Sequence, residues 1–229
     1  MDHDEVRVRP YQPGDLDDLY RVCLLTAFHG GDGTAAFRDP RLPGQVYAAP
    51  YAIFEPSLAF VAQDADGVAG YIVAALDSLT FERRLEQDWW PGLRSRYPEP
   101  ATDLAGRLSA QERRAIQNIH RPLETAPELA ERFPSQLHMN LLRRLQGRGI
   151  GRRLIQTLIA QLRARGSQGL HLGTGLDNHR AADFFRHVGF TEFAVADWRL
   201  FVMDLTRSGL GIDLDAPDYQ PGKPMERRK

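Results

Sequence analysis

The sequence contains very little cysteine and very little lysine. Cys23 is the only cysteine among 229 residues, which excludes a disulfide within the chain. It lies on the apolar stripe of a predicted helix, and we expect it to be a small buried hydrophobe. Lysine occurs only at Lys223 and Lys229, so arginine carries nearly all of the positive charge.

A basic excess and long apolar runs are also absent. The formal net charge is −1, which argues against a general affinity for nucleic acid or an anionic membrane, so any anion site must be local. No run approaches the ~18 apolar residues of a membrane span, and the acidic start Met1-Asp2-His3-Asp4-Glu5 is unlike a signal peptide. We therefore expect a cytoplasmic protein without membrane or nucleic-acid partners.

The length and the hydrophobic content of the chain are typical of one α/β domain. Hydrophobic residues make up 42% of the chain, enough to bury one substantial core. Apolar and β-branched runs predict strands, and an Asp66-Gly67 turn joins two of them into a hairpin. The predicted strands are 6–9, 58–63, 68–76, 137–142, 169–173, 191–195 and 198–205. Helical periodicity is clearest from Pro13 to Ala27, in 152–165 and in 178–188. The stretch 35–55 is hard to assign, although 44–51 within it looks helical.

A long insertion, 77–134, separates the hairpin from the next strand. Ser109-Ala110-Gln111-Glu112 and Thr125-Ala126-Pro127-Glu128 each fit a capping box, so we expect a small helical subdomain. Adjacent Trp89 and Trp90 fit either the wall of a binding site or packing against the sheet. The interpretation is a single domain, 1–205, with 77–134 inserted and a tail, 206–229, that is mobile or draped on the surface.

A glycine-rich loop, Gln146-Gly147-Arg148-Gly149-Ile150-Gly151, connects a predicted strand to a predicted helix. Alternating glycines let the backbone turn sharply and expose N–H groups, and the first helical turn leaves further donors unpaired. This arrangement suits a phosphate or pyrophosphate.

Two common phosphate-binding loops do not match. A P-loop needs Gly-Lys-Ser/Thr where this chain has Gly151-Arg152-Arg153, and the Rossmann pattern places Arg152 where its third glycine belongs. No matching carboxylate follows Gly166. A nucleotide-binding phosphotransferase is therefore a disfavoured hypothesis.

A two-part pattern does match. Gln146-x-x-Gly149-x-Gly151 resembles the acetyl-CoA signature of the GCN5-related N-acetyltransferases (GNAT). Asn178-x-x-Ala181-x-x-Phe184-Phe185-x-x-x-Gly189-Phe190 resembles their second motif. More narrowly, the insertion and 138–190 are similar to bacterial relatives of the C-terminal acetyltransferase-like domain of O-GlcNAcase.

The resemblance implies a fold and a cofactor. The fold is the GNAT fold, an α/β arrangement with a mixed central sheet of about seven strands, a splayed parallel pair, flanking helices and the helical insertion. The cofactor is acetyl-CoA, with no metal, and the protein is a monomer or homodimer. The cofactor-binding residues implied are Met139, Asn140, Leu141, Gln146, Gly147, Arg148, Gly149, Ile150, Gly151, Arg152, Asn178, Ala181, Phe184 and Phe185. Arg148 and Arg152 would bind phosphates; they could equally be solvated surface arginines.

The reaction implied is direct attack of an amine on the thioester in a ternary complex. An alkylamine with a pKa of ~10.4 must lose a proton first, so a base is needed. His138 is the first candidate and Asp32 the second, although a packed strand histidine and a turn aspartate explain them too. Asp32, Trp89 and Trp90 are candidate substrate-binding residues. The acceptor is a small-molecule or peptide amine whose identity the sequence leaves open.

One residue departs from the family pattern. Many members have tyrosine at the position of Phe185, where the hydroxyl protonates the departing thiolate. Phenylalanine cannot do so. A second hypothesis is therefore an acetyl-CoA-binding pseudo-acetyltransferase that acts as a sensing or interaction domain.

Overall fold

A seven-stranded mixed sheet forms the centre of the described chain, which in this computed structural model comprises residues 5–28, 30–99, 107–195 and 198–206. Within these residues the strand order is β1-β2-β3-β4-β5-β7-β6, and every neighbouring pair is antiparallel except β4–β5. The strands are β1 (Arg7–Pro10), β2 (Ala59–Asp64), β3 (Gly67–Ala75), β4 (Ser135–Leu141), β5 (Gly169–Gly175), β6 (Thr191–Val195) and β7 (Trp198–Asp204). The predicted α/β class and mixed sheet are confirmed.

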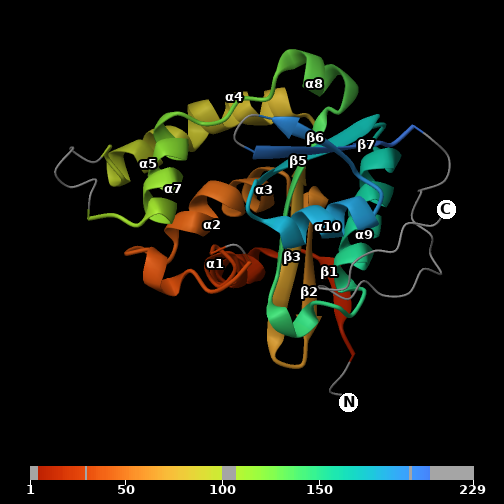
Figure 1. Cartoon of the computed structure of the whole chain (residues 1–229), viewed down its shortest axis with the longest axis horizontal. Coiled ribbons are helices and arrows are strands. Elements are labelled where there is room, and N and C mark those ends of the chain that lie inside the picture. Colours follow the sequence, from red (N-terminus) through yellow and green to blue (C-terminus); the bar gives the residue numbers. More distant parts are fainter. Residues whose placement is uncertain (1–4, 29, 100–106, 196–197, 207–229) are drawn as a thin grey trace.

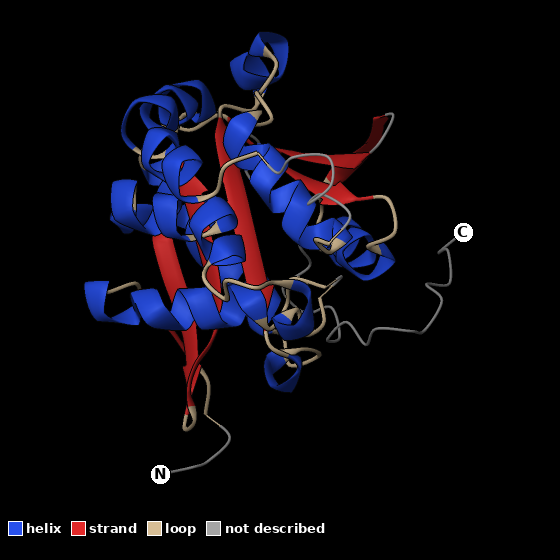
Figure 2. Ribbon diagram, turned by 90° about the vertical axis from the view of Figure 1, so that its left-hand side faces the viewer, coloured by secondary structure: helices blue, strands red, loops and turns tan. Residues whose placement is uncertain are grey.

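The parallel pair separates after two residues. Ser135 pairs with Leu170 and Gln136 with His171, and no further pairing joins β4 to β5. In Figure 2 the strands accordingly form two groups that diverge from one another. The predicted splay is confirmed, and from Leu137 onward one edge of β4 has no strand partner among the described residues.

Helices cover both faces of the β1–β4 half of the sheet (Figure 1). On one face, α9 (Ile150–Ala164) packs against β1, β2 and β3 through an apolar stripe in which each side chain is at most 1% exposed. The stripe consists of Leu154, Ile155, Leu158, Ile159 and Leu162. Burial of each of these side chains contributes about 1.5–3 kcal/mol before the entropy of folding is subtracted. On the other face lie α1 (Leu16–Leu24), α2 (Leu42–Tyr47) and α3 (Ala49–Phe54). Short 3-10 helices occupy Pro13–Asp15, Thr34–Ala36, Pro56–Leu58 and Arg143–Leu145.

The insertion begins and ends at adjacent points of the sheet. Ser78 N–H donates to Pro134 O at 2.8 Å, and Ser135 Oγ donates to Leu76 O at 2.7 Å. Its helices are α4 (Ser78–Asp88), α5 (Trp90–Arg96), α7 (Ala110–His120) and α8 (Pro127–Arg132). Helices α4, α5 and α7 share a hydrophobic cluster with α2, and α8 contacts α4, so the insertion packs on the side of the sheet that α1, α2 and α3 cover.

One predicted helix start is correct and the other is wrong. Ser109 is the N-cap of α7, and its Oγ accepts the Glu112 N–H at 2.9 Å. The cap expected at Thr125 does not form, because α8 begins one residue later with Ala126 as its N-cap. Thr125 instead donates its N–H and hydroxyl to the Glu82 carboxylate, at 3.1 and 2.6 Å. A carboxylate from another helix therefore outcompeted the local cap.

Trp89 and Trp90 pack within the helical layer. Trp90 is 5% exposed in the cluster shared with α2, and Trp89 Nε1 donates to Gln45 O at 2.9 Å. None of the helices in the described ranges combines the length and apolarity needed to cross a membrane. Most of the predicted tail, 207–229, lies outside the described residues.

Candidate functional site

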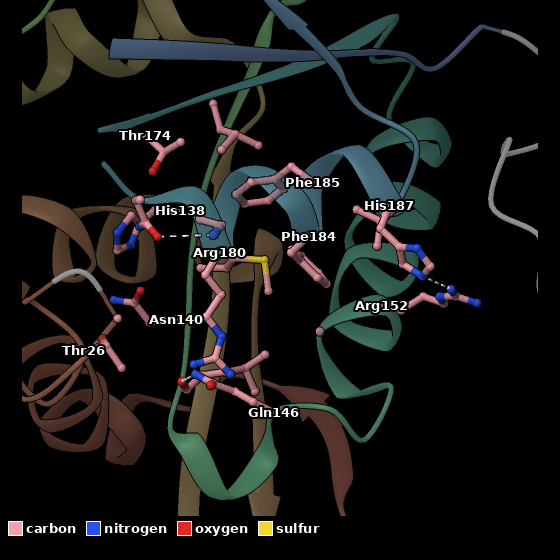
Figure 3. Close-up of a pocket in the computed structure, with 18 of the residues that line it drawn as sticks. Thr26, His138, Asn140, Gln146, Arg152, Thr174, Arg180, Phe184, Phe185 and His187 are labelled. Atoms are coloured by element: carbon pink, nitrogen blue, oxygen red, sulfur yellow. Dashed lines mark hydrogen bonds between the residues drawn. The ribbon is translucent and has the colours of Figure 1, made fainter. Parts of the chain in front are cut away.

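A cavity of about 250 Å³ opens where β4 and β5 part (Figure 3). Its walls come from both strands, from the glycine loop after β4 and from α10 (His179–His187). Further lining residues, Thr26 and Gly30, come from the turns that follow α1. The cavity therefore joins the two faces of the sheet through the splay.

The glycine loop adopts the conformation that its sequence predicts. Gly147 and Gly149 have φ angles of +73° and +72°, the left-handed region that other residues rarely adopt. Within the described chain, no protein acceptor is found for the N–H groups of Gly147, Gly149, Ile150 and Gly151. These donors lie at the N-terminus of α9, where the helix dipole favours negative charge. The loop can therefore hold an anion.

Gln146 turns its side chain back onto β4. Its Nε2 donates to Leu141 O at 2.7 Å, while Oε1 is buried and has no hydrogen-bond partner in the described part of the chain. A buried acceptor without a donor costs free energy. A ligand N–H in the cavity would satisfy it.

Two arginines line the cavity. Arg180 stands in the first turn of α10 and extends toward Gln146 (Figure 3), and no hydrogen bond or ion pair to it is found among the described residues. Arg152 contacts His187, with 2.8 Å between Arg152 Nη2 and His187 Nε2. Burial and the Arg152 guanidinium lower the pKa of His187, which keeps that ring neutral and able to accept the bond. Both guanidiniums raise the electrostatic potential of the cavity.

The α10 wall combines a cap with aromatic rings. Asn178 is the N-cap, and its Oδ1 accepts the Ala181 N–H at 3.2 Å. Phe184 and Phe185 both line the cavity. Phe185 is 5% exposed, and its ring centroid lies 5.5 Å from those of Phe190 and Phe201. Phe185 is thus a packing residue that presents no hydroxyl.

His138 lies at the other end of the cavity, on the face of β4 toward α1. It shares that face with Asn140 and with Tyr71 of β3, which pairs with Asn140. Tyr71 Oη lies 3.2 Å from His138 Nδ1, and the Tyr47 ring stacks on His138 with 5.9 Å between centroids. Burial lowers the pKa of His138 to about 4, so its ring is neutral at physiological pH.

The structure brings most of the predicted cofactor residues to one cavity. Met139, Asn140, Leu141, Gln146, Gly147, Gly149, Gly151, Arg152, Asn178, Ala181, Phe184 and Phe185 line it. Arg148 and Ile150 do not: Arg148 is exposed, and the Ile150 side chain is buried in the core.

Three predicted substrate residues lie elsewhere. Asp32 is exposed, and its Oδ1 accepts the N–H and the hydroxyl of Thr34 at 2.8 and 2.6 Å. These bonds stabilise the turn in which Asp32 itself lies, which is a common role of aspartate. Trp89 and Trp90 pack between helices and are not among the lining residues.

Sequence reasoning missed several lining residues, among them Thr26, Thr174, Arg180 and His187. Arg180 follows the N-cap Asn178 by two residues, a position at which a cation is unfavourable for the helix dipole. This unfavourable placement of a cation was the one feature of the local sequence that could have indicated Arg180. The others depend on contacts between distant segments.

Known proteins share this architecture. Residues 137–190 match the model of the acetyltransferase (GNAT) family. The crystal structure of SsHAT is 33% identical to this chain, covers 89% of it and 100% of SsHAT, and superimposes with a TM-score of 0.79. The chain belongs to the GNAT family.

Two further relatives are informative. Protein O-GlcNAcase of Rattus norvegicus is 26% identical over 188 residues, which are 82% of this chain and 20% of that protein, so the chain spans about a fifth of it. The expected resemblance to O-GlcNAcase is confirmed. The structure of yncA from Salmonella typhimurium, determined with its cofactor acetyl-CoA, is 15% identical, with 93% of this chain and 98% of yncA covered and a TM-score of 0.51. That likeness concerns the fold.

Proposed function

We propose that the protein is an acetyl-CoA-dependent N-acetyltransferase that acetylates an amine by direct attack in a ternary complex. The observation that carries this proposal is the opening of the sheet beside the glycine loop. The splay exposes the edge of β4 next to unbonded N–H groups of the loop. An extended, amide-bearing chain that ends in a pyrophosphate is complementary to both features.

The residues present fit acetyl-CoA. The loop amides of Gly147 to Gly151 and the guanidinium of Arg180 would hold the pyrophosphate. The free edge of β4 from Leu137 to Leu141 would pair with the pantetheine amides as an added strand does. Gln146 Oε1 offers a buried acceptor to an amide N–H.

When bound, acetyl-CoA supplies an activated acetyl group: the amine nitrogen bonds to the acetyl carbon, the carbon–sulfur bond breaks, and one amine proton ends on the sulfur. The protein contributes orientation and hydrogen-bond donors. His138, Asn140 and Thr174 line the part of the cavity beyond the glycine loop, where we place the reacting end. The acceptor class we propose is a small-molecule or peptide amine.

One observation favours a second function, an acetyl-CoA-binding domain without turnover. Phe185 fills the position at which many family members carry a tyrosine hydroxyl, and it is packed against Phe190 and Phe201. A coenzyme A thiol with a pKa of ~8.5 leaves without strong acid catalysis, so transfer stays chemically feasible.

Two measurements separate these functions. Calorimetry with acetyl-CoA and with ATP tests the cofactor: binding of ATP without acetyl-CoA contradicts the proposal. Thiol release over a panel of amines then tests turnover. Release with at least one amine supports the transferase, whereas binding without release supports the second function.

A further inference from the structure

The Tyr71 hydroxyl lies beside one of the two ring nitrogens of His138. Tyr71 is fully buried, and its Oη accepts Asn140 Nδ2–H at 3.0 Å while lying 3.2 Å from His138 Nδ1. A buried hydroxyl that donates to nothing costs about 1–3 kcal/mol. The Tyr71 proton is therefore donated to one of its neighbours.

His138 Nδ1 is the best acceptor among those neighbours. The Asn140 amide nitrogen is a donor only. The Cys23 thiol is also hydrogen-bonded to the Tyr71 hydroxyl, but it is a weak acceptor, and burial raises the pKa of Cys23 to about 12, so it stays protonated. An imidazole nitrogen with a lone pair is a strong acceptor. With Nδ1 accepting, the proton of the neutral ring lies on Nε2.

The protonated edge of the ring is the edge left for a ligand. No hydrogen bond to His138 Nε2 is found in the described ranges. The side-chain atoms there that are both buried and without a partner are Ser78 Oγ and Gln146 Oε1, so Nε2 is not enclosed. Because His138 lines the cavity, an N–H group rather than a lone pair is available in it.

We propose that Tyr71 holds His138 as a neutral hydrogen-bond donor to the thioester, so that His138 acts as an electrophilic group and not as the base. This inference rests on the proposed function. His138 is then the catalytic residue, and Tyr71 is a positioning residue that acts through it. Asn140 supports the arrangement by donating to Tyr71.

A neutral imidazole is suited to this task. Its N–H stabilises negative charge that develops on a carbonyl oxygen, and the ring keeps its own proton throughout. Burial lowers the pKa of His138 to about 4, which keeps the ring neutral when the protein is active. Such a ring cannot take the proton of an alkylammonium ion with a pKa near ~10.4, so the amine must arrive unprotonated.

The first test needs neither cofactor nor activity. ¹⁵N NMR of histidine-labelled protein at pH 7 reports which ring nitrogen is protonated, and His138→Gln assigns the signal by its loss. We expect protonated Nε2 and unprotonated Nδ1 in the wild type, and a mixture of tautomers in Tyr71→Phe. A proton on Nδ1 in the wild type, as when the Asn140 amide is reversed, overturns the proposal.

The second test compares two replacements of His138. Glutamine keeps an N–H donor and cannot act as a base, whereas glutamate is a base without a donor. We expect His138→Gln to retain kcat within about tenfold and His138→Glu to lose about 100-fold, the typical effect of removing one such donor. The opposite ranking overturns the donor role.

Controls keep the outcomes distinct. Both variants are compared at equal acetyl-CoA occupancy and equal thermal stability, with His138→Ala as the baseline without either group. A wild-type protein that binds no acetyl-CoA contradicts the proposed function and with it this role. Normal binding and turnover with the wrong tautomer overturn this inference alone.

Discussion

Gly151 and Phe184 approach so closely that a Cβ atom on Gly151 would lie 2.9 Å from Phe184 Cζ. This contact joins the first turn of α9 to α10 and closes one side of the cavity. A glycine is needed there because the aromatic ring occupies the space of a side chain.

We expect Gly151→Val to weaken acetyl-CoA binding strongly, because two methyl groups must displace the Phe184 ring into the cavity. Gly151→Ala should have a smaller effect, since the ring tip can shift. Calorimetry measures both. Combining Gly151→Ala with Phe184→Leu should restore much of the lost affinity, and strictly additive losses in the double variant would contradict this explanation.

Gly149→Glu is expected to abolish acetyl-CoA binding. Its φ of +72° strains any other residue except asparagine and similar side chains, and a carboxylate would enter the proposed pyrophosphate space. Gly149→Asn separates the two causes, because asparagine tolerates this backbone and adds no charge. We expect calorimetry to show residual binding for Gly149→Asn. Equal affinities of Gly149→Asn and Gly149→Glu for acetyl-CoA would argue against an anion site in the glycine loop.

Arg180→Gln should raise the Kd for acetyl-CoA about 10- to 100-fold, since hydrogen bonds to charged groups contribute about 1.5–3 kcal/mol each. The Kd for acetyl-pantetheine, which lacks the pyrophosphate, should not change. Arg186→Gln is the matched control on the same helix, because Arg186 is bound to Asp183 and Glu192. An equal loss for both ligands would place Arg180 away from the phosphates.

Stability should depend on pH through His138. The folded protein keeps this ring neutral down to a pKa of about 4, whereas the unfolded chain takes up the proton near pH ~6.5. Between these values the unfolded state binds more protons, so stability falls as the pH falls, by up to about 3 kcal/mol. Above pH ~6.5 the ring is neutral in both the folded and the unfolded state, so none of this stability is lost.

Urea unfolding of the wild type and His138→Gln at several pH values measures this effect. Other histidines with lowered pKa, such as His171 and His187, are common to both proteins and cancel in the difference. The free-energy difference between the two proteins should narrow or reverse from pH 6.5 to 4. A difference that stays constant with pH would show that His138 is not held neutral by folding.

Local patterns predicted most of the elements. The hairpin, the glycine loop and α9 were evident because alternation, an Asp-Gly turn and helical spacing are properties of neighbouring residues. The start of α8 was missed because Glu82 takes the donors of Thr125. Glu82 lies 43 positions away in the chain, which no local capping pattern can include.

The candidate site divides in the same way. The glycine loop that we propose binds the pyrophosphate was predictable, because its donors are consecutive backbone N–H groups. Arg180 was not, because its place opposite Gln146 depends on how α10 packs beside the loop. The sequence around Trp89 and Trp90 was equally compatible with packing and with ligand binding, because only the tertiary arrangement of the helices shows what these side chains contact.

The sequence by itself determined the glycine loop that we propose binds the acetyl donor, because a run of backbone N–H donors followed by a helix is built from one short segment. Only the tertiary structure decided which residues line the end of the cavity where we propose that the reaction takes place. The register of β3 against β4 places Tyr71, His138 and Asn140 on the α1 face, and a shift of β4 by one residue would turn His138 and Asn140 to the opposite face, away from Tyr71. That register, and the burial that keeps His138 neutral, arise from residues distant in the chain.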